Sequence, residues 1–209
     1  MDLLARLFPD MADRMDEFYE CILQTLAMVG IVGVVSFVLS LSFAVILVVT
    51  RPGGLASNPV VYHVLDELIN FFRSVPFIIL ATTIIPVTRA VMGTAIGLRG
   101  AVFPLIIGIT PFFSRQMESA LLGVDSGLVE AATSLGMPKV EIIWRVYLRE
   151  AIPRIAKVTS ITIVNLLSLT AVIGVVGGGG LGDFAIRYGF QRYMFDASVA
   201  VVLVYMVFI

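Results

Sequence analysis

The stretch Ile22–Val49, ILQTLAMVGIVGVVSFVLSLSFAVILVV, contains 28 consecutive residues without a charged side chain. A membrane-spanning α-helix needs about 20 predominantly apolar residues, so this stretch predicts one spanning helix that is long enough to tilt. The helix is expected to end at Thr50-Arg51-Pro52-Gly53-Gly54, because a cation, a proline and two glycines together stop a helix. The stretch therefore indicates an all-α membrane protein.

The composition requires lipid as the solvent for much of the chain. Of 209 residues, 59% are hydrophobic and 14% are charged, whereas a soluble domain has about 45–50% apolar and about 25% charged residues. A core of this size cannot hide such an excess. The net charge of −1 gives no indication of a nucleic-acid partner. Cys21 is the only cysteine, which excludes an internal disulfide, and His63, the only histidine, is expected to be a loop or interface residue.

Four further spans are expected after the first, giving five in all. The second contains Arg73, Pro76 and Pro86, and prolines are tolerated in membrane helices when neighbouring groups satisfy the freed carbonyls. A polar loop is expected before it, at residues 55–63. The four further spans are expected at Val64–Val87, Gly100–Leu122, Ile155–Val176 and from Ala197 onward.

The two ends of the chain differ in character. Residues 1–20 carry six acids and two arginines, whereas a signal peptide begins basic and then runs apolar. We therefore expect residues 1–21 to be an amphipathic or flexible lead-in, and residues 22–209 to be the transmembrane domain. The final run VAVVLVYMVFI (199–209) is apolar but shorter than a span of about 20 residues, which favours a protein that continues beyond Ile209.

The loop cations set the expected orientation. With five spans, the loops after the first and third spans share one side of the membrane, and each side carries six Lys and Arg residues. Five of these cations cluster between residues 139 and 157, while acids dilute the N-terminal pair. Because cytoplasmic loops are rich in Lys and Arg, we expect the loop at 123–157 in the cytoplasm and the N-terminus on the outer side of the membrane, which would be the periplasm in a bacterial inner-membrane protein.

This loop also contains a spaced motif. Residues 123–157 hold too many charges to span, but apolar residues recur at helical spacing, so short helices on the membrane surface are expected. The motif consists of Glu130-Ala131-Ala132, three residues, Gly136, nine residues and Val146-Tyr147-Leu148-Arg149. It resembles the signature EAA-x3-G-x9-I-x-L-P of ABC importer permeases. Arg149 stands where the signature has proline, and Pro153 follows four residues later.

Other segments extend the resemblance to the methionine importer permeases, from about Thr50 to the C-terminus. They are Val49–Gly53, Asn70–Leu80, Ile85–Arg89 and Gly178–Gly182. The resemblance implies a type I ABC importer permease of five spanning helices in the bacterial inner membrane. It further implies a homodimer, two ABC ATPase subunits that bind ATP–Mg, and a periplasmic methionine-binding lipoprotein. This chain would hold no cofactor and no metal of its own.

In the family, the loop forms a coupling helix that docks in a groove of the ATPase. The resemblance assigns this contact to Glu130, Ala131, Ala132, Gly136 and Met137. The residue types suit the role, because small side chains permit close docking and Gly136 permits a sharp turn. We expect Glu130 near the start of the helix, where the helix dipole favours a carboxylate.

Several residues within the spans carry structural expectations. Arg73 must face water, reach the interface or pair with an acid, and Asp66 and Glu67 are candidate partners. We expect Arg73 and Pro76 to have structural or gating roles. Arg115 and Glu118, spaced i,i+3 in the third span, are expected to form an ion pair that braces the loop or anchors it at the interface.

A glycine run follows the fourth span. Gly177–Gly182 formally contains G-x-G-x-x-G, but no strand is expected before it, which argues against dinucleotide binding. Gly178 and Gly179 are instead expected in a tight re-entrant turn or hinge near the outer face, and Gly174 and Gly178 form a small-xxx-small pair. The sequence has no G-x-x-x-x-G-K-[ST] loop, so another polypeptide must hydrolyse the nucleotide.

The fourth span is rich in hydroxyl side chains. They either hydrogen-bond within and between helices or line the permeation path, in which case Asn165, Leu169 and Val172 are the pathway residues.

Our interpretation is an ATP-driven importer of methionine, as the D or L form or a related derivative, that works by alternating access. The alternatives are a permease for another amino acid or small organic solute, and a secondary transporter or channel. The last alternative requires a buried acid or an internal repeat. Apart from Asp66 and Glu67 near the start of the second expected span, Glu118 is the only acid within an expected span, and no repeat is found. No set of catalytic residues indicates an enzyme.

Overall fold

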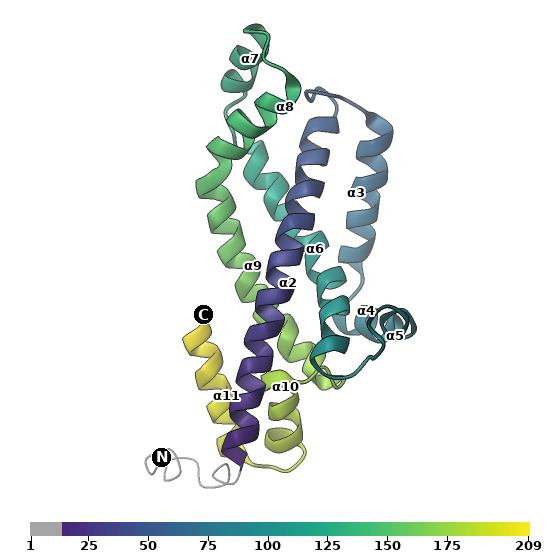
Figure 1. Ribbon diagram of the computed structural model, residues 1–209, viewed down its shortest axis with the longest axis vertical. Coiled ribbons are helices and arrows are strands. Elements are labelled where there is room, and N and C mark those ends of the chain that lie inside the picture. The colour runs from purple at the N-terminus through teal and green to yellow at the C-terminus, as the bar shows by residue number, and fades with distance from the viewer. Residues whose placement is uncertain (1–13) are drawn as a thin grey trace. The chain divides into compact units, whose positions relative to one another are not determined.

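The computed structural model describes residues 14–209, and every regular element in this part of the chain is helical (Figure 1). This confirms the expected all-α class, whereas most of the expected lead-in, residues 1–13, lies outside the described residues. The elements in chain order are α2 (Met15–Thr50), α3 (Pro59–Ser74), α4 (Phe77–Thr83), α5 (Ile85–Met92), α6 (Gly97–Leu122), α7 (Ser126–Ser134), α8 (Lys139–Ile142), the π-helix η2 (Ile143–Leu148), α9 (Arg149–Val175), α10 (Gly180–Phe184), the π-helix η3 (Ala185–Phe190) and α11 (Phe195–Phe208).

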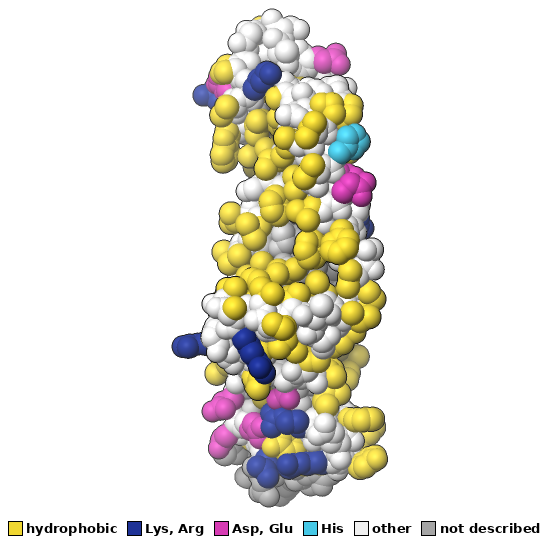
Figure 2. Space-filling view, turned by 90° about the vertical axis from the view of Figure 1, so that its right-hand side faces the viewer, with side chains coloured by type: hydrophobic (Ala, Val, Ile, Leu, Met, Phe, Trp, Pro, Cys, Tyr) yellow, Lys and Arg dark blue, Asp and Glu magenta, His cyan; other side chains and the backbone are white. Residues whose placement is uncertain are grey.

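Three helical runs are long and apolar enough to cross a membrane. They are Met15–Thr50, Gly97–Leu122 and Lys139–Val175, and Phe195–Phe208 is a shorter apolar helix. Apolar side chains make up much of the surface drawn in Figure 2, with charged side chains in a few groups. Such a surface is stable in lipid rather than in water. The multi-span reading therefore holds, but the expected number of five spans is not confirmed.

The expected second span, Val64–Val87, is wrong as a single helix. Helix α3 ends at Ser74, and Val75 adopts an extended conformation with ψ 124° before Pro76. A proline clashes with a helical residue before it, so the chain breaks here and restarts as α4 and then α5. The expected polar loop at 55–63 is also too long, because α3 begins at Pro59. There the Asn58 side chain caps the helix by accepting from the N–H of Val61 at 3.2 Å.

The expected boundary near Ile155 is also wrong. The chain is helical without interruption from Lys139 to Val175 through α8, η2 and α9, so the second half of the 123–157 loop begins the next long helix. The π-helical turn explains how one face stays buried. Ile142, Tyr147 and Ala151 are all buried at spacings of five and four residues, and a π-turn adds one residue to the helical repeat.

The chain forms two compact units, to which α2, α6 and α9 each contribute part of their length. Unit 1 comprises residues up to Gly33 together with Pro76–Ile106 and Ile163–Ile209, and unit 2 comprises Val34–Val75 and Ile107–Thr162. Unit 1 has a buried apolar core of its own, made by Phe18, Cys21, Leu181, Phe184, Tyr188, Ala197, Ala200 and Val201.

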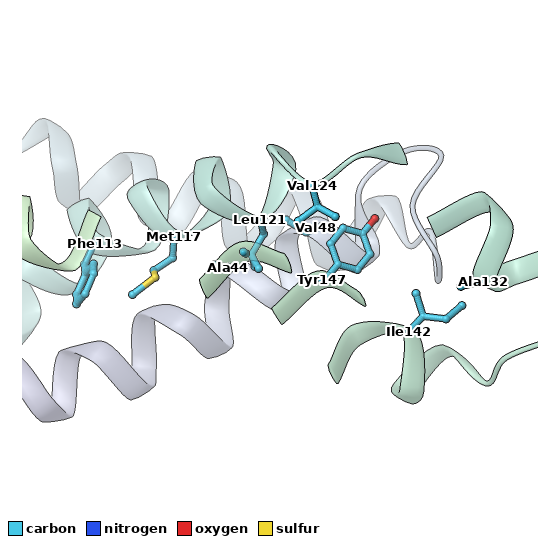
Figure 3. Close-up of a cluster of buried hydrophobic side chains, with 10 residues drawn as sticks. Ala44, Val48, Phe113, Met117, Leu121, Val124, Ala132, Ile142 and Tyr147 are labelled. Carbon is cyan, nitrogen blue, oxygen red and sulfur yellow. The ribbon is translucent and has the colours of Figure 1, made fainter. Parts of the chain in front are cut away.

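The core of unit 2 lies around the motif residues. Ala44 and Val48 of α2 meet Phe113, Met117 and Leu121 of α6 (Figure 3). The same cluster includes Val124, Ala132, Ile142, Tyr147 and Ala151. Burial of apolar surface at about 25 cal/mol per Å² makes this cluster the main anchor for the segment between α6 and α9.

Candidate functional site

The candidate site is the signature segment, Glu130–Arg149, with the helix α7 that leads into it. The Asp125 side chain caps α7 by accepting from the N–H of Gly127 at 2.8 Å. The helix ends in a Schellman arrangement: the N–H of Met137 donates to the carbonyl of Ala132 at 3.2 Å, and that of Gly136 to Thr133 at 3.0 Å. Gly136 has φ 74°, so the expected sharp turn at this glycine is confirmed.

The expected position of Glu130 is wrong. Helix α7 begins at Ser126, so Glu130 is in the middle of the helix and the helix-dipole argument does not apply to it. The capping carboxylate is Asp125 instead. The Glu130 side chain forms no hydrogen bond or ion pair with residues 14–209, and it is exposed. Glu130 is thus available to a partner.

The three EAA positions face different surroundings. Ala132 is buried in the core of unit 2, in the same cluster as Ile142 and Tyr147 (Figure 3). Ala131 and Glu130 are exposed. One side of α7 therefore packs on its own chain while another side faces outward.

Large apolar side chains are exposed around this segment. Leu135 is 81% exposed, at the end of α7, and Trp144 is 67% exposed, in η2. Leu128 and Val140 are exposed as well. Exposed apolar residues at this density mark an interaction surface.

A cavity of about 680 Å³ opens beside α7. Its walls come from the turn after α2, the end of α6, α7 itself and Tyr147 of η2. Arg51 and Glu130 both line it, as do the hydroxyl side chains of Ser126, Thr133 and Ser134.

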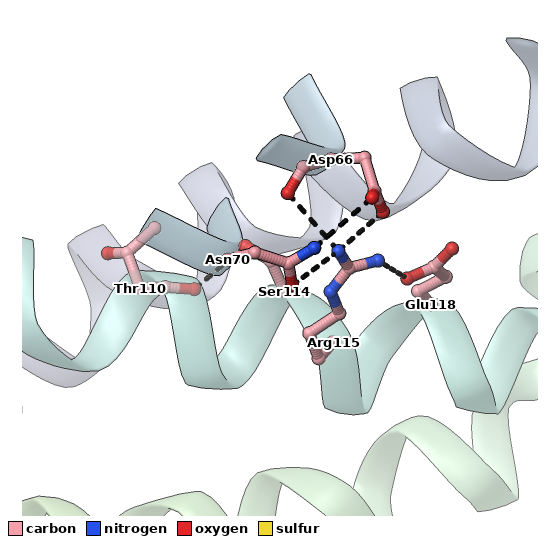
Figure 4. A network of polar contacts seen from close by, with 6 residues as sticks. All are labelled: Asp66, Asn70, Thr110, Ser114, Arg115 and Glu118. Atoms are coloured by element: carbon pink, nitrogen blue, oxygen red, sulfur yellow. Dashed lines mark hydrogen bonds and ion pairs between the residues drawn. The ribbon is translucent and has the colours of Figure 1, made fainter. Parts of the chain in front are cut away.

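A polar network joins α3 to α6 within unit 2 (Figure 4). Arg115 donates to Asp66 Oδ1 at 2.5 Å, to Asn70 Oδ1 at 2.9 Å and to Glu118 Oε2 at 2.7 Å. The side chains of Arg115, Asp66 and Glu118 are 19%, 20% and 11% exposed. The expected Arg115–Glu118 pair is confirmed, and Asp66 and Asn70 are members that sequence reasoning missed.

This network overturns the expected pairing of Asp66 with Arg73. Asp66 is bonded to Arg115 and Asn70. Arg73 is exposed in the last turn of α3 and has no ion pair to any described residue. Pro76, also exposed, caps α4. Both residues therefore flank the break between α3 and α4.

The hydroxyls of α9 largely bond within their own helix. Thr159 donates to Ile155 O at 2.7 Å and Thr162 to Val158 O at 2.8 Å. Ser160, Ser168 and Thr170 also donate to carbonyls three or four residues earlier.

The expected pathway residues share one face of α9. Asn165, Leu169 and Val172 lie at i, i+4 and i+7, which is one side of a helix. All three are partly exposed. The side-chain amide of Asn165 has no hydrogen-bond partner within residues 14–209.

The glycine run forms a tight turn in unit 1, as expected. Gly177, Gly179 and Gly180 have φ of 84°, 79° and 75°, values that favour glycine. Two side chains of α2, which is remote in the sequence, cap the start of α10. The N–H of Gly180 donates to Gln24 Oε1 and the N–H of Leu181 donates to Thr25 Oγ1, both at 2.9 Å. Gln24 and Thr25 carried no sequence signal, because they lie 156 residues away from these partners.

Close backbone packing in the same unit predicts a stability effect. A Cβ on Gly182 would overlap the backbone of Ala171, and overpacking costs about 1–3 kcal/mol. We expect Gly182→Ala to lower the melting temperature of the detergent-solubilised protein.

The matched control is Gly30→Ala in α2. No atom lies within 4 Å of a Cβ built at Gly30, and alanine is better than glycine inside a helix by about 0.5–1 kcal/mol. The control is expected to raise the melting temperature slightly. The same shift in both variants would show that the α9–α10 contact is not close-packed.

A second polar cluster lies in unit 1. Arg187 bonds to Glu17 Oε1 at 2.6 Å and to Asp183 Oδ2 at 2.8 Å, and the Tyr188 hydroxyl donates to Glu17 Oε2 at 2.5 Å. The bond to the Glu17 carboxylate raises the pKa of Tyr188 above its ordinary value. The cluster ties the start of α2 to η3.

The described residues offer no site for a resident metal, because no group of three His, Cys, Asp or Glu side chains among them could hold one. No strand precedes the glycine run within residues 14–209, so the context of a dinucleotide-binding turn is missing.

Comparisons with known proteins agree with each other. Residues 46–209 match the family described as binding-protein-dependent transport system inner membrane component. The chain is 49% identical over 89% of its length, and 82% of the relative's, to the probable D-methionine transport system permease protein MetI of Vibrio cholerae serotype O1. It is 48% identical to the D-methionine transport system permease protein MetI of Yersinia pestis, over 62% of this chain and 60% of that one. A chain of the MetNI methionine ABC transporter, solved in inward-facing conformations, is similar with a TM-score of 0.87 and 37% identity, covering 94% of this chain and 93% of that one.

Proposed function

Because the chain belongs to the family of binding-protein-dependent transport system inner membrane components, we propose that it forms the translocation pathway of an ATP-driven methionine importer in the bacterial inner membrane. The observation that carries the proposal is the 49% identity, over 89% of the chain, to a D-methionine transport permease. The transported solute is methionine in its D or L form or a related derivative. The chain itself makes and breaks no covalent bond.

The proposed assembly contains two copies of this chain, two ATPase subunits and a periplasmic methionine-binding lipoprotein. The likeness to a chain of the MetNI methionine ABC transporter supports the ATPase and permease partners. Since the sequence lacks the G-x-x-x-x-G-K-[ST] loop that cradles phosphates, ATP–Mg binds to the ATPase subunits.

The signature segment is the proposed docking site for the ATPase. Ala132 packs on its own chain, while Glu130 and Ala131 are exposed for contact. Gly136 and Met137 form the turn that sets the direction of the next helix. Leu135 and Trp144 would supply apolar contact area, which aromatic and aliphatic anchors typically do at interfaces.

The translocation pathway is proposed to follow one face of α9. Asn165 offers an unpaired amide, and Leu169 and Val172 on the same face offer an apolar constriction. Gly178 and Gly179 would act as a hinge at the end of this helix, and Arg73 with Pro76 would stabilise the α3–α4 break.

In the proposed alternating-access cycle, closure of the two ATPase subunits draws the two docking sites together and opens the permease outward. Hydrolysis of ATP then returns the permease to the inward-facing state.

The proposed orientation places the N-terminus in the periplasm, with residues 22–209 as the transmembrane domain. The cations between residues 139 and 157 support a cytoplasmic position for the docking site.

Solute identity is tested by competition. In proteoliposomes containing the complete transporter, we expect unlabelled D- or L-methionine to abolish uptake of labelled methionine, because both compete for the same binding protein and pathway. Unrelated amino acids at the same concentration should leave uptake unchanged. If another amino acid or a small organic anion competes better than methionine does, the importer assignment stands but the solute is wrong.

A further inference from the structure

The turn from η3 to α11 in unit 1, Phe190–Phe195, is rich in exposed aromatic side chains. It reads Phe-Gln-Arg-Tyr-Met-Phe, from the last residue of η3 to the first residue of α11. Phe190, Tyr193 and Phe195 are 73%, 88% and 77% exposed. Large apolar groups exposed together in this way mark a surface that contacts a partner or a membrane.

The backbone of the turn holds Tyr193 in an unusual conformation. Tyr193 has φ 56° and is the one non-glycine residue with positive φ among residues 14–209. This region of backbone space is unfavourable for a bulky side chain and favours glycine. The N–H of Met194 donates to the carbonyl of Tyr188 at 3.1 Å and fixes the turn. A tyrosine kept exposed at a position that suits glycine points to a use for its ring outside the chain.

Arginine side chains gather beside the turn. The guanidinium carbons of Arg192, Arg187 and Arg14 lie 4.8, 5.3 and 5.7 Å from the centroid of the Tyr188 ring. Arg187 has two carboxylate partners. Arg14 and Arg192 are exposed and form no ion pair with residues 14–209. Two accessible cations at one aromatic ring are therefore available to an anion.

The other acids of this region do not face these two cations. Phe18 points into the core of unit 1, and Asp16 and Glu20 each lie two residues from it. Two residues correspond to opposite sides of a helix with 3.6 residues per turn, so both acids lie on the far side of α2, where they are exposed. Asp196 accepts from the N–H of Ala197 at 2.8 Å, at the start of its own helix.

The cluster lies where the chain enters the hydrocarbon. The uncharged stretch of α2 begins at Ile22, and α11 continues without a charged residue from Ala197. Glu17, five residues before Ile22, is bonded to Arg187 of η3 at 2.6 Å, which holds the turn beside the start of α2. Residues just outside the apolar stretch of a spanning helix lie at the depth of the lipid headgroups, where aromatic rings are favoured.

We propose that Arg192 and Arg14 bind the phosphate of an anionic phospholipid of the phosphatidylglycerol type, with Phe190, Tyr193 and Phe195 placed among the surrounding headgroups. A guanidinium binds a phosphate with two parallel hydrogen bonds. Two cations without an ion pair favour a lipid with a net negative charge over a zwitterionic one. The proposal concerns this turn alone, so it can fail while the transport function stands, and it can hold if the solute is not methionine.

The test is native mass spectrometry of the assembled transporter after delipidation, titrated with phosphatidylglycerol. Arg192→Gln is expected to weaken binding by about tenfold, because one charge-assisted pair is lost, and Arg192→Lys should retain part of the affinity. Arg14→Gln should weaken binding as well. The matched control is Arg99→Gln, since Arg99 is exposed in the first turn of α6 and has no ion pair to residues 14–209. Phosphatidylethanolamine should bind the unchanged protein more weakly, because its ammonium group offsets the phosphate charge.

Tyr193→Gly separates lipid binding from folding. The change removes the exposed ring but suits φ 56°, so we expect weaker phosphatidylglycerol binding without a lower melting temperature. Unchanged binding in Tyr193→Gly would show that the ring does not contact lipid.

Three further results would overturn the proposal. Equal phosphatidylglycerol binding in Arg192→Gln, Arg99→Gln and the unchanged protein would show that Arg192 makes no lipid contact. Displacement of the lipid by inorganic phosphate would indicate a soluble anion as the ligand. Displacement of the lipid by the binding protein would assign the turn to a protein interface instead of the membrane.

Discussion

Glu130→Arg is expected to reduce ATP-dependent methionine uptake by at least about tenfold while the permease remains folded. Glu130 is exposed and has no partner within the described part of the chain, so reversing its charge removes no internal contact. At a docked interface, an unpaired or like-charged group costs about 2–5 kcal/mol, and every 1.4 kcal/mol is about tenfold in an equilibrium constant. Uptake into proteoliposomes and co-purification of the ATPase with the permease measure the effect.

Glu150→Arg is the matched control for this charge reversal. Glu150 is also exposed and without an ion pair to residues 14–209, but it lies just beyond the signature segment. We expect near-normal uptake in this variant. Unchanged uptake in Glu130→Arg, with the same amount of ATPase retained, would show that Glu130 does not contribute to coupling.

Arg115→Met is expected to lower the free energy of unfolding by about 3–5 kcal/mol, the cost of removing one partner from a buried ion pair. Arg115 is the only cation in the network, and its loss would leave the carboxylates of Asp66 and Glu118 without compensation. The side chains of all three are at most 20% exposed, so solvent screens the interaction little. Chemical or thermal unfolding in detergent measures the loss.

Arg145→Met provides the comparison. Arg145 pairs with Glu141 at 3.0 Å, but its side chain is 71% exposed, and exposed i,i+4 pairs contribute about 0.3–0.5 kcal/mol. Equal destabilisation of the two variants would contradict the structural role of the network. Combining Asp66→Asn with Arg115→Met should cost less than the sum of the single changes, because the groups act together.

The sequence predicted the long helices where the apolar pattern was uninterrupted. Ile22–Val49 and Gly100–Leu122 both correspond to observed helices, α2 and α6, with slightly wider bounds. The second span could not be placed, because hydropathy does not register that Pro76 forces Val75 out of the helical conformation. The helix from Lys139 to Val175 was divided because its charges between residues 139 and 157 suggested a loop with short surface helices. In the structure this part is continuous with α9, and Ile142, Tyr147 and Ala151 are buried along it.

The candidate site was predictable where the signal is local. The signature residues and the turn at Gly136 follow from spacing and from the conformational freedom of glycine. The Arg115 network was only half predictable, because Glu118 is three residues away in the sequence whereas Asp66 is 49 residues away. The capping of α10 by Gln24 and Thr25 depends on tertiary structure in the same way. Local patterns indicate which residues are candidates, and only the fold selects their partners.

The most direct test of the transport proposal is the ATP dependence of methionine accumulation. Proteoliposomes with the permease, its ATPase and the binding protein are given labelled methionine outside, with ATP and Mg²⁺ available to the ATPase subunits. We predict that the internal methionine concentration rises above the external concentration with hydrolysable ATP and does not rise with a non-hydrolysable analogue. Accumulation that is equal without ATP, or that follows an ion gradient instead, would contradict the proposal and indicate a secondary transporter.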